Sequence, residues 1–200
     1  MRIFVAGATG VIGVRLVPLL VSAGHQVAGM TRSPGKEGRL RELGAEPVVC
    51  DVFDAGTLTK AVTGFAPGAV YHQLTDLPDA LSELAGFRAR NDRIRTEGTR
   101  NLLAAAAAAK AERFIAQSVS WETPEARRWQ VIAGHERAVL AAGGVVIRYG
   151  TLWGPGTYYE TSPPDRPRIH VDDAARQSLP ALAAPPGVTL VADDRAAPAT

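Results

Sequence analysis

Short apolar runs alternate with amphipathic segments along the whole chain, which is the pattern of an α/β protein. The apolar runs predict buried strands at 3–6, 26–30, 45–50, 69–72, 113–117, 145–149 and 188–191. The segments between them carry apolar residues at helical spacing and predict helices at 14–21, 35–43, 57–63, 79–111 (broken near Gly86), 124–142 and 171–183. Strands and helices that alternate in this way form a parallel sheet covered on both faces. The pattern therefore predicts a doubly wound α/β fold in a single domain.

A glycine-rich turn follows the first predicted strand. Gly7, Gly10 and Gly13 lie directly before the helix at 14–21. In such a turn the first glycine allows the bend, the second lets the backbone approach a phosphate, and the third lets the helix pack on the strand. The helix N-terminus then offers N–H groups to the anion. We therefore expect a Rossmann-type sheet whose turn binds the pyrophosphate of a dinucleotide, with contacts also from Thr9, Val11 and Ile12.

The end of the second predicted strand indicates which dinucleotide binds. An NAD site places Asp or Glu there to accept from the ribose hydroxyls, whereas this chain has Thr31, Arg32 and Ser33, with Lys36 close behind. A guanidinium can pair with a phosphate through two hydrogen bonds, and a serine can donate another. We therefore expect NADP(H), bound by Arg32 and Ser33, rather than NAD(H). The alternative is that Arg32 and Lys36 are solvated loop charges.

Composition narrows the functional classes. A chain of 200 residues with 46% hydrophobic content suits one cofactor-binding domain, 1–200, with a proper core. The net charge is only +2 and no basic stripe is interleaved with aromatics, which argues against nucleic acid. Cys50 is the sole cysteine, and no cluster of ligating residues has metal spacing. Without a signal peptide or a membrane-length apolar run, we expect a cytoplasmic enzyme with a small-molecule substrate.

Several motifs together resemble the extended and atypical short-chain dehydrogenase/reductase superfamily, most of all its NAD-dependent epimerase/dehydratase-like members. The motifs cover nearly the whole chain in the family's order: 7–13, 51–52, 72–73, 91–103, 117–118, 148–156 and 170–175. The resemblance implies that Asp51 and Val52 flank the adenine and that His72 and Gln73 line the cofactor. It also implies that Ser118 lies at or near the family's catalytic serine or threonine, beside the cofactor.

Two departures from the family matter for the chemistry. The family carries Tyr-x-x-x-Lys after the fifth strand, but no tyrosine occurs between Tyr71 and Tyr149. If Glu136 is aligned with the family's glutamate, Arg128 stands at the tyrosine position and Ile132 at the lysine position. The family's long substrate-binding segment is also reduced to a short loop at about 154–170. We therefore expect a truncated C-terminal substrate region without the usual proton relay.

Four side chains remain as candidates for catalysis: Ser118, Ser120, Arg128 and Tyr158. A serine at the strand end can bond a substrate carbonyl or instead satisfy local backbone groups. Arg128 can stabilise an anionic substrate or be a solvated helix charge. Tyr158 can replace the missing acid or simply pack against cofactor or substrate. His72 can titrate near neutrality, although a structural contact is the plainer interpretation.

These observations favour an NADP(H)-dependent reductase-type oxidoreductase that acts on a small organic substrate. A redox-neutral isomerase, cyclase or dehydratase on the same fold, and a non-catalytic NADP(H) sensor, stay open as alternatives. We also expect a homodimer, because the related family pairs the helices after its fourth and fifth strands. Here those helices carry apolar residues at helical spacing: Leu102, Leu103, Val131, Ile132, Val139 and Leu140. Burial of these residues against the sheet is the alternative.

Overall fold

The computed structural model describes residues 1–121 and 126–193, with the main chain alone for 126–128. In this part of the chain, seven parallel strands form one sheet in the order β3-β2-β1-β4-β5-β6-β9. The strands are β1 Arg2–Ala6, β2 Gln26–Thr31, β3 Glu46–Val49, β4 Ala69–His72, β5 Arg113–Val119, β6 Val145–Tyr149 and β9 Gly187–Val191. All seven lie at the predicted places, which confirms the doubly wound parallel sheet.

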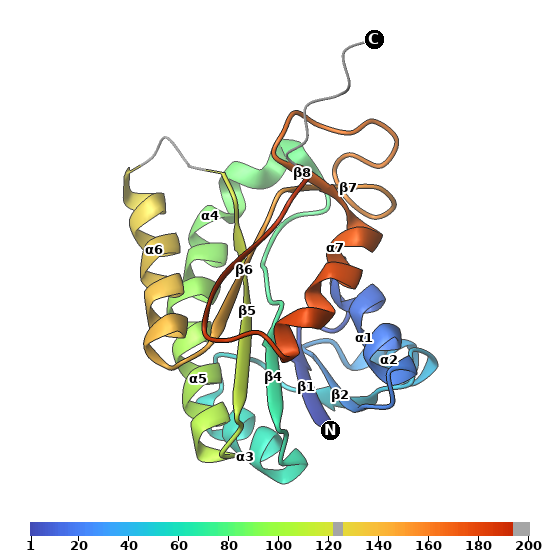
Figure 1. Ribbon diagram of the computed structural model, residues 1–200, viewed down its shortest axis with the longest axis vertical. Coiled ribbons are helices and arrows are strands. Elements are labelled where there is room, and N and C mark those ends of the chain that lie inside the picture. The colour runs from blue at the N-terminus through green and yellow to red at the C-terminus, as the bar shows by residue number, and fades with distance from the viewer. Residues whose placement is uncertain (122–125, 194–200) are drawn as a thin grey trace.

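Helices cover both faces of this sheet (Figure 1). They are α1 Gly13–Ser22, α2 Glu37–Glu42, α3 Ala55–Phe65, α4 Leu84–Arg93, α5 Thr99–Ala108, α6 Ala126–Ala141 and α7 Val171–Ser178. Short 3-10 segments lie at Pro34–Lys36, Leu81–Glu83 and Leu179–Leu182. The helices α1 and α7 pack on one face, whereas α3, α5 and α6 pack on the other.

The two cores follow from the alternation of side chains along each strand. In β1, Ile3 and Val5 enter the core under α1 and α7, while Phe4 and Ala6 enter the core under α3, α5 and α6. All four side chains are fully buried. A continuous apolar strand of this kind is stable only where both faces of the sheet are covered.

The helix predicted at 79–111 is shorter in the structure, from Leu84 to Ala108, and it is interrupted at a different place. Gly86 does not break it: this glycine lies inside α4, and a Cβ added there would meet nothing within 4 Å. Instead a π-helical turn, Ile94–Gly98, joins α4 to α5. Gly98 packs there against Val52, and the side chain of Asn101 donates to the Val52 carbonyl at 3.0 Å. The irregular turn therefore follows from packing against Val52, a contact that the position of glycines in the sequence does not predict.

A second, two-stranded sheet lies beyond the carboxyl ends of the main strands, at the upper end of Figure 1. It pairs β7 Thr151–Trp153 with β8 Arg168–His170 in parallel. The residues between them form a short loop, called the substrate loop below after the role predicted for it. The sequence did not predict these strands because each has only three residues. The helix predicted to reach 183 ends at Ser178 and continues as the 3-10 segment.

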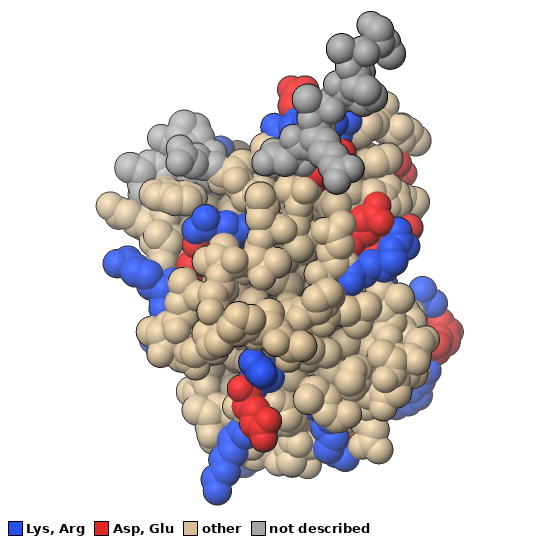
Figure 2. All heavy atoms as spheres, in the orientation of Figure 1, with Lys and Arg blue, Asp and Glu red and all other residues tan. Residues whose placement is uncertain are grey.

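On the face that Figure 2 shows, basic and acidic side chains lie beside one another rather than in a basic stripe. Among the described residues, no helix has both the length and the apolar character needed to cross a bilayer. Some of the charged side chains form local pairs on one helix, such as Arg39 with Glu42 and Arg41 with Glu37.

Candidate cofactor and active site

The glycine turn lies where β1, α1 and the end of β4 meet. Gly7 has φ +89°, and a Cβ there would stand 2.6 Å from the carbonyl oxygen of Gln73. A Cβ on Gly13 would stand 2.2 Å from the carbonyl oxygen of Gly7. Only glycine fits at either position. Within the described part of the chain, no side chain caps α1 at Ile12, so this end of the helix fits the pyrophosphate predicted for it.

The loop after β2 lies against the same turn. The hydroxyl of Thr9 donates to the hydroxyl of Thr31 at 3.4 Å, and the Thr31 hydroxyl accepts from the main-chain N–H of Ser33 at 3.2 Å. These contacts bring Thr9, Thr31 and Ser33 together beside the glycine turn. The predicted contact of Ser33 with a phosphate remains a prediction.

Arg32 contacts a residue that the sequence analysis did not single out. Its guanidinium pairs with both carboxylate oxygens of Asp76, at 3.3 and 3.4 Å. Asp76 is buried in the loop after β4, and it also pairs with Arg90 of α4. Arg32 is therefore not a purely solvated charge. A carboxylate four residues after the fourth strand was the available signal, but its partner Arg32 lies 44 positions away in sequence.

Asp51 and Val52, predicted to flank the adenine, lie between β3 and α3. The Asp51 side chain is exposed, and its carboxylate accepts from the main-chain N–H of Phe53 at 2.9 Å. Val52 is buried against the π-helical turn. The loop is therefore fixed by its own hydrogen bond and by Val52, and a contact with adenine stays a prediction.

His72 lies in a buried chain of hydrogen bonds that runs from β4 through α5 to α6. Its Nδ1 accepts from the main-chain N–H of Leu74 at 3.3 Å, so its Nε2–H donates to the hydroxyl of Thr99 at 3.0 Å. The Thr99 hydroxyl donates to Nδ1 of His135 at 2.8 Å, and the His135 Nε2–H donates to the Gln117 carbonyl at 3.0 Å. The tautomer of each ring is assigned from the partner at its end of the chain, because the Leu74 N–H can only donate and the Gln117 carbonyl can only accept.

The surroundings keep this histidine pair neutral. Burial, together with the charges of His135 and Arg95, holds the pKa of His72 well below its ordinary value. Burial and the charge of Arg95 lower the pKa of His135 to about 4. A fully buried ring with both nitrogens bonded does not exchange protons with a substrate. The geometry of His72 is that of a structural contact.

Ser118 and Ser120 have different surroundings. The Ser118 hydroxyl donates to Glu136 at 2.6 Å, and Glu136 also accepts two hydrogen bonds from Arg148, at 2.9 and 2.5 Å. Burial opposes ionisation of Glu136, but the bonds from Arg148 and Ser118 outweigh it and hold its pKa below the ordinary value. The Ser120 hydroxyl is buried and has no partner among the described residues. Ser120 directly follows β5.

The two other catalytic candidates are Arg128 and Tyr158. Arg128 lies in the first turn of α6, and its side chain is outside the described part of the structure. The Tyr158 hydroxyl donates to the carbonyl of Pro78 at 2.6 Å, which ties the substrate loop to the loop after β4. Burial and the charges of Asp79 and Glu83 raise the pKa of Tyr158. These surroundings make Tyr158 a weaker acid than a free tyrosine.

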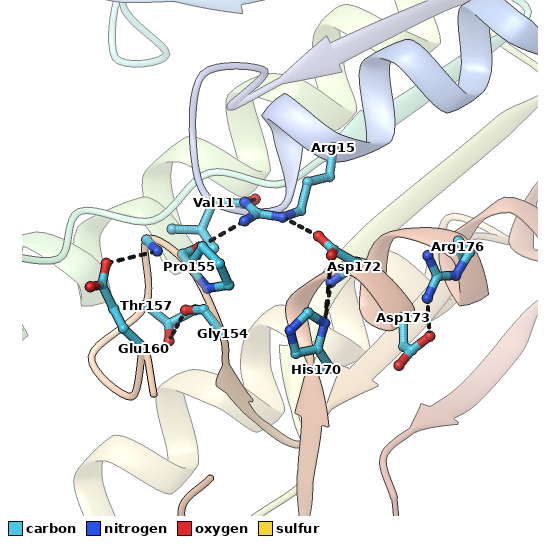
Figure 3. A network of polar contacts seen from close by, with 11 residues as sticks. Val11, Arg15, Gly154, Pro155, Thr157, Glu160, His170, Asp172, Asp173 and Arg176 are labelled. Atoms are coloured by element: carbon cyan, nitrogen blue, oxygen red, sulfur yellow. Dashed lines mark hydrogen bonds and ion pairs between the residues drawn. The ribbon is translucent and has the colours of Figure 1, made fainter. Parts of the chain in front are cut away.

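Arg15 of α1 connects the glycine turn with the substrate loop (Figure 3). Its guanidinium donates to the carbonyl of Val11 at 2.9 Å, to the carbonyl of Pro155 at 2.7 Å and to the carboxylate of Asp172 at 2.6 Å. His170 caps the N-terminus of α7, because its ring accepts from the main-chain N–H of Asp172 at 3.3 Å. The sequence analysis missed Arg15, whose partners lie 140 and 157 positions away.

Comparisons with known proteins agree with this geometry. A family model described as NAD(P)H-binding matches residues 7–144. A 3-diazoavenalumate denitrifying reductase from Streptomyces is 33% identical, and the match covers 100% of this chain and 78% of the relative. A 4-hydroxy-2-methyl-3-oxo-4-farnesyl-3,4-dihydroquinoline-1-oxide ketoreductase from Stigmatella aurantiaca is 28% identical over 77% of this chain and 51% of its own length.

Solved structures share the fold at low sequence identity. The UDP-glucose 4-epimerase of Thermus thermophilus, in complex with NAD, has a TM-score of 0.78 at 20% identity and covers 98% of this chain and 78% of its own. The corresponding epimerase of Thermotoga maritima, with UDP-glucose, has a TM-score of 0.79 at 19% identity, with the same coverage. These similarities bear on the fold of the chain.

Proposed function

We propose that this chain, which belongs to the NAD(P)H-binding family of the atypical short-chain dehydrogenase/reductase superfamily, is an NADP(H)-dependent reductase of a small organic substrate. The observation that carries the proposal is the glycine turn, where a Cβ at Gly7 or Gly13 would collide with the backbone. Arg32 and Ser33 at the end of β2 support NADP(H) over NAD(H). The dinucleotide, when bound, supplies hydride, and the protein binds and orients the substrate.

The side chains near the strand ends favour a reaction that needs no strong acid. His72 and His135 are buried and neutral, and the Tyr158 hydroxyl already donates to Pro78. Among the described residues the Ser120 hydroxyl has no hydrogen-bond partner, and we propose it as the donor that bonds a substrate. We assign Ser118 a positioning role through Glu136, and Arg128 remains a candidate for holding an anionic group of the substrate.

A substrate with a diazonium group on carbon meets this requirement. Hydride forms a new C–H bond at that carbon while the C–N bond breaks and dinitrogen leaves with its electron pair. The diazonium compound is reduced, the nicotinamide is oxidised, and no proton is consumed. The Streptomyces relative, whose name describes a reductase that removes nitrogen from a diazo compound, supports this substrate class. We therefore place aryl diazonium compounds first among the candidate substrates.

The test follows the transferred hydride. Protein is mixed with 4-deuterated NADPH and an aryl diazonium salt, beside ketones, enones, quinones and imines, and the products are analysed by mass spectrometry. We expect deuterium at the carbon that carried nitrogen, formed faster than without protein. Gly7→Ala should abolish this rate because its Cβ enters the phosphate turn. Gly64→Ala, at a helical position with nothing within 4 Å, is the matched control that should keep it.

The alternatives make different forecasts for the same assay. Wild-type protein that binds NADPH tightly but oxidises it with none of these substrates would contradict the reductase. Turnover of a substrate with no net consumption of NADPH would favour the redox-neutral enzyme. Silence in both assays would favour the NADP(H) sensor.

A further inference from the structure

We propose that Arg90 of α4 is a second ligand for the phosphate on the adenosine ribose of NADP(H), and that Asp76 holds Arg90 and Arg32 together as a two-guanidinium clamp. This inference rests on the proposed binding of NADP(H). It adds a residue that is distant in sequence from the strand end at which such phosphates are usually recognised.

The clamp is a compact ion-pair cluster. Arg90 donates through Nε and Nη2 to the two oxygens of Asp76, both at 3.0 Å, and Arg32 donates to the same two oxygens at 3.3 and 3.4 Å. The Asp76 side chain is 8% exposed. Its main-chain N–H donates to the buried side chain of Asn91 at 3.2 Å, which fixes the carboxylate against α4.

The cluster lies on the ribose side of the predicted cofactor site. Arg32 directly follows β2, and Asp76 follows β4, while β1 and its glycine turn lie between these two strands in the sheet. The Arg32–Asp76 pair therefore reaches across the end of β1. In this fold the ribose hydroxyl that carries the phosphate in NADP(H) lies near the end of the second strand. Arg90 is thus brought to that position from a helix.

The charges of the cluster favour a phosphate over a hydroxyl. Two guanidiniums share one carboxylate, so the cluster has one excess positive charge. Their side chains are 59% exposed for Arg32 and 49% exposed for Arg90, and each guanidinium has N–H donors beyond those that Asp76 accepts. An anion with several oxygens can accept these donors, whereas a single hydroxyl gains little from them.

Arg90 is also held in place before any ligand binds. Its guanidinium stacks on the ring of Phe87 at 4.4 Å, on the same helix. A side chain fixed by stacking and by two hydrogen bonds loses little conformational entropy when it binds a phosphate. The cluster is therefore a built recognition element rather than two independent surface charges.

The experiment uses adenosine 2′,5′-bisphosphate and adenosine 5′-monophosphate as probes, with affinities measured by calorimetry. Wild-type protein should bind the bisphosphate more tightly. Arg90→Gln should weaken bisphosphate binding by about tenfold or more, as for loss of a charge-assisted contact, and leave the monophosphate unchanged. Arg32→Gln should do the same. Arg137→Gln, which removes an exposed arginine from α6, is the control of equal charge and should change neither affinity.

The outcomes separate this inference from the proposed cofactor. Loss of the bisphosphate preference in Arg32→Gln but not in Arg90→Gln would overturn the clamp and leave the NADP(H) preference intact. Equal affinity of the wild-type protein for both probes would overturn both. If Arg90→Gln is unstable, Arg90→Met replaces it, because the methionine side chain can still pack on Phe87. Arg90→Met should likewise weaken bisphosphate binding and leave monophosphate binding unchanged.

Discussion

At the scale of single residues, Ser118 and Ser120 differ in their hydrogen-bond partners, and this difference decides which of them can bond a substrate. Ser118 donates to a carboxylate that is itself paired with Arg148, whereas Ser120 has no partner among the described residues. A hydroxyl that already bonds an ionised group is poorly available to a substrate, because breaking that bond leaves the buried carboxylate less well satisfied. The free hydroxyl is therefore the better substrate donor.

We expect Ser120→Ala to lower turnover by up to about tenfold while leaving NADPH affinity unchanged, because the variant loses one hydrogen bond that would orient the substrate for hydride transfer. Ser118→Ala should instead lower the free energy of unfolding by about 1–3 kcal/mol, because Glu136 loses a bond. Steady-state kinetics, calorimetry and urea denaturation of both variants measure these effects. A Ser120→Ala variant with full activity, beside an inactive but stable Ser118→Ala variant, would return the catalytic role to Ser118.

The residue scale also marks the limit of prediction from sequence. The glycine turn was predictable because its three glycines are local and each has a steric cause. Arg32 was recognised as a candidate, but Asp76 and Arg90 were not. Their pairing depends on loops that meet only after β2 and β4 take their places around β1. Side-chain partners far apart in sequence have no periodic signal.

At the scale of secondary-structure elements, apolar patterning located the strands well because both faces of the sheet are buried. It failed for β7 and β8, since three residues are too few to establish a period. It also failed for the π-helical turn at Ile94–Gly98, which reflects packing of Gly98 on Val52. Elements shaped by tertiary contacts, rather than by local pattern, are the ones that sequence analysis missed.

The histidine chain that ties β4 to α5 and α6 predicts a pH dependence of stability. The pKa of His135 falls from 6.5 to about 4 on folding because of burial and the charge of Arg95. The unfolded chain therefore binds more protons between these values, so the free energy of unfolding decreases as pH falls from about 6.5 to about 4. His135 alone contributes about 3 kcal/mol to this loss.

Urea denaturation at several pH values between 4 and 7 measures this dependence. His135→Gln should reduce the slope to the part that His72 contributes, whereas His25→Gln, at a half-buried position outside the histidine chain, should retain most of the slope. His72 adds to the slope in the same direction, because its pKa is also lowered. A wild-type stability that stays constant over this range would contradict the neutral buried pair.

Arg15 gives a second prediction at the scale of elements, because it joins α1, the substrate loop and α7 (Figure 3). Arg15→Met should increase hydrogen exchange of residues 154–170 and cost about 1–2 kcal/mol of stability, a value reduced by the exposure of Asp172. Arg176→Met is the control, since the ion pair of Arg176 among the described residues is with Asp173 on its own helix (Figure 3). Unchanged exchange of the loop in Arg15→Met would show that Arg15 does not hold it.

At the scale of the whole molecule, the remaining question is assembly, and we propose a homodimer through α5 and α6. Three of the six apolar residues considered for this interface are buried within the protomer, in agreement with the alternative of burial against the sheet: Leu102, Ile132 and Val139. Leu103, Val131 and Leu140 are only partly buried. A hollow of about 380 Å³ lies between the two helices, lined in part by Leu103, Gly134 and Ala138. Small residues beside a hollow allow a second pair of helices to approach closely.

We therefore expect a dimeric mass by light scattering at micromolar protein concentration. Ala138→Arg, an exposed position beside the hollow, should shift the protein to monomers, because the long side chain would fill the hollow and two copies would add like charges to Arg95 and Arg100, which already line it. Thr63→Arg on α3 adds the same charge outside the hollow and should remain dimeric. A monomeric wild-type mass would contradict the dimer. A dimer unaffected by Ala138→Arg would move the interface away from α5 and α6.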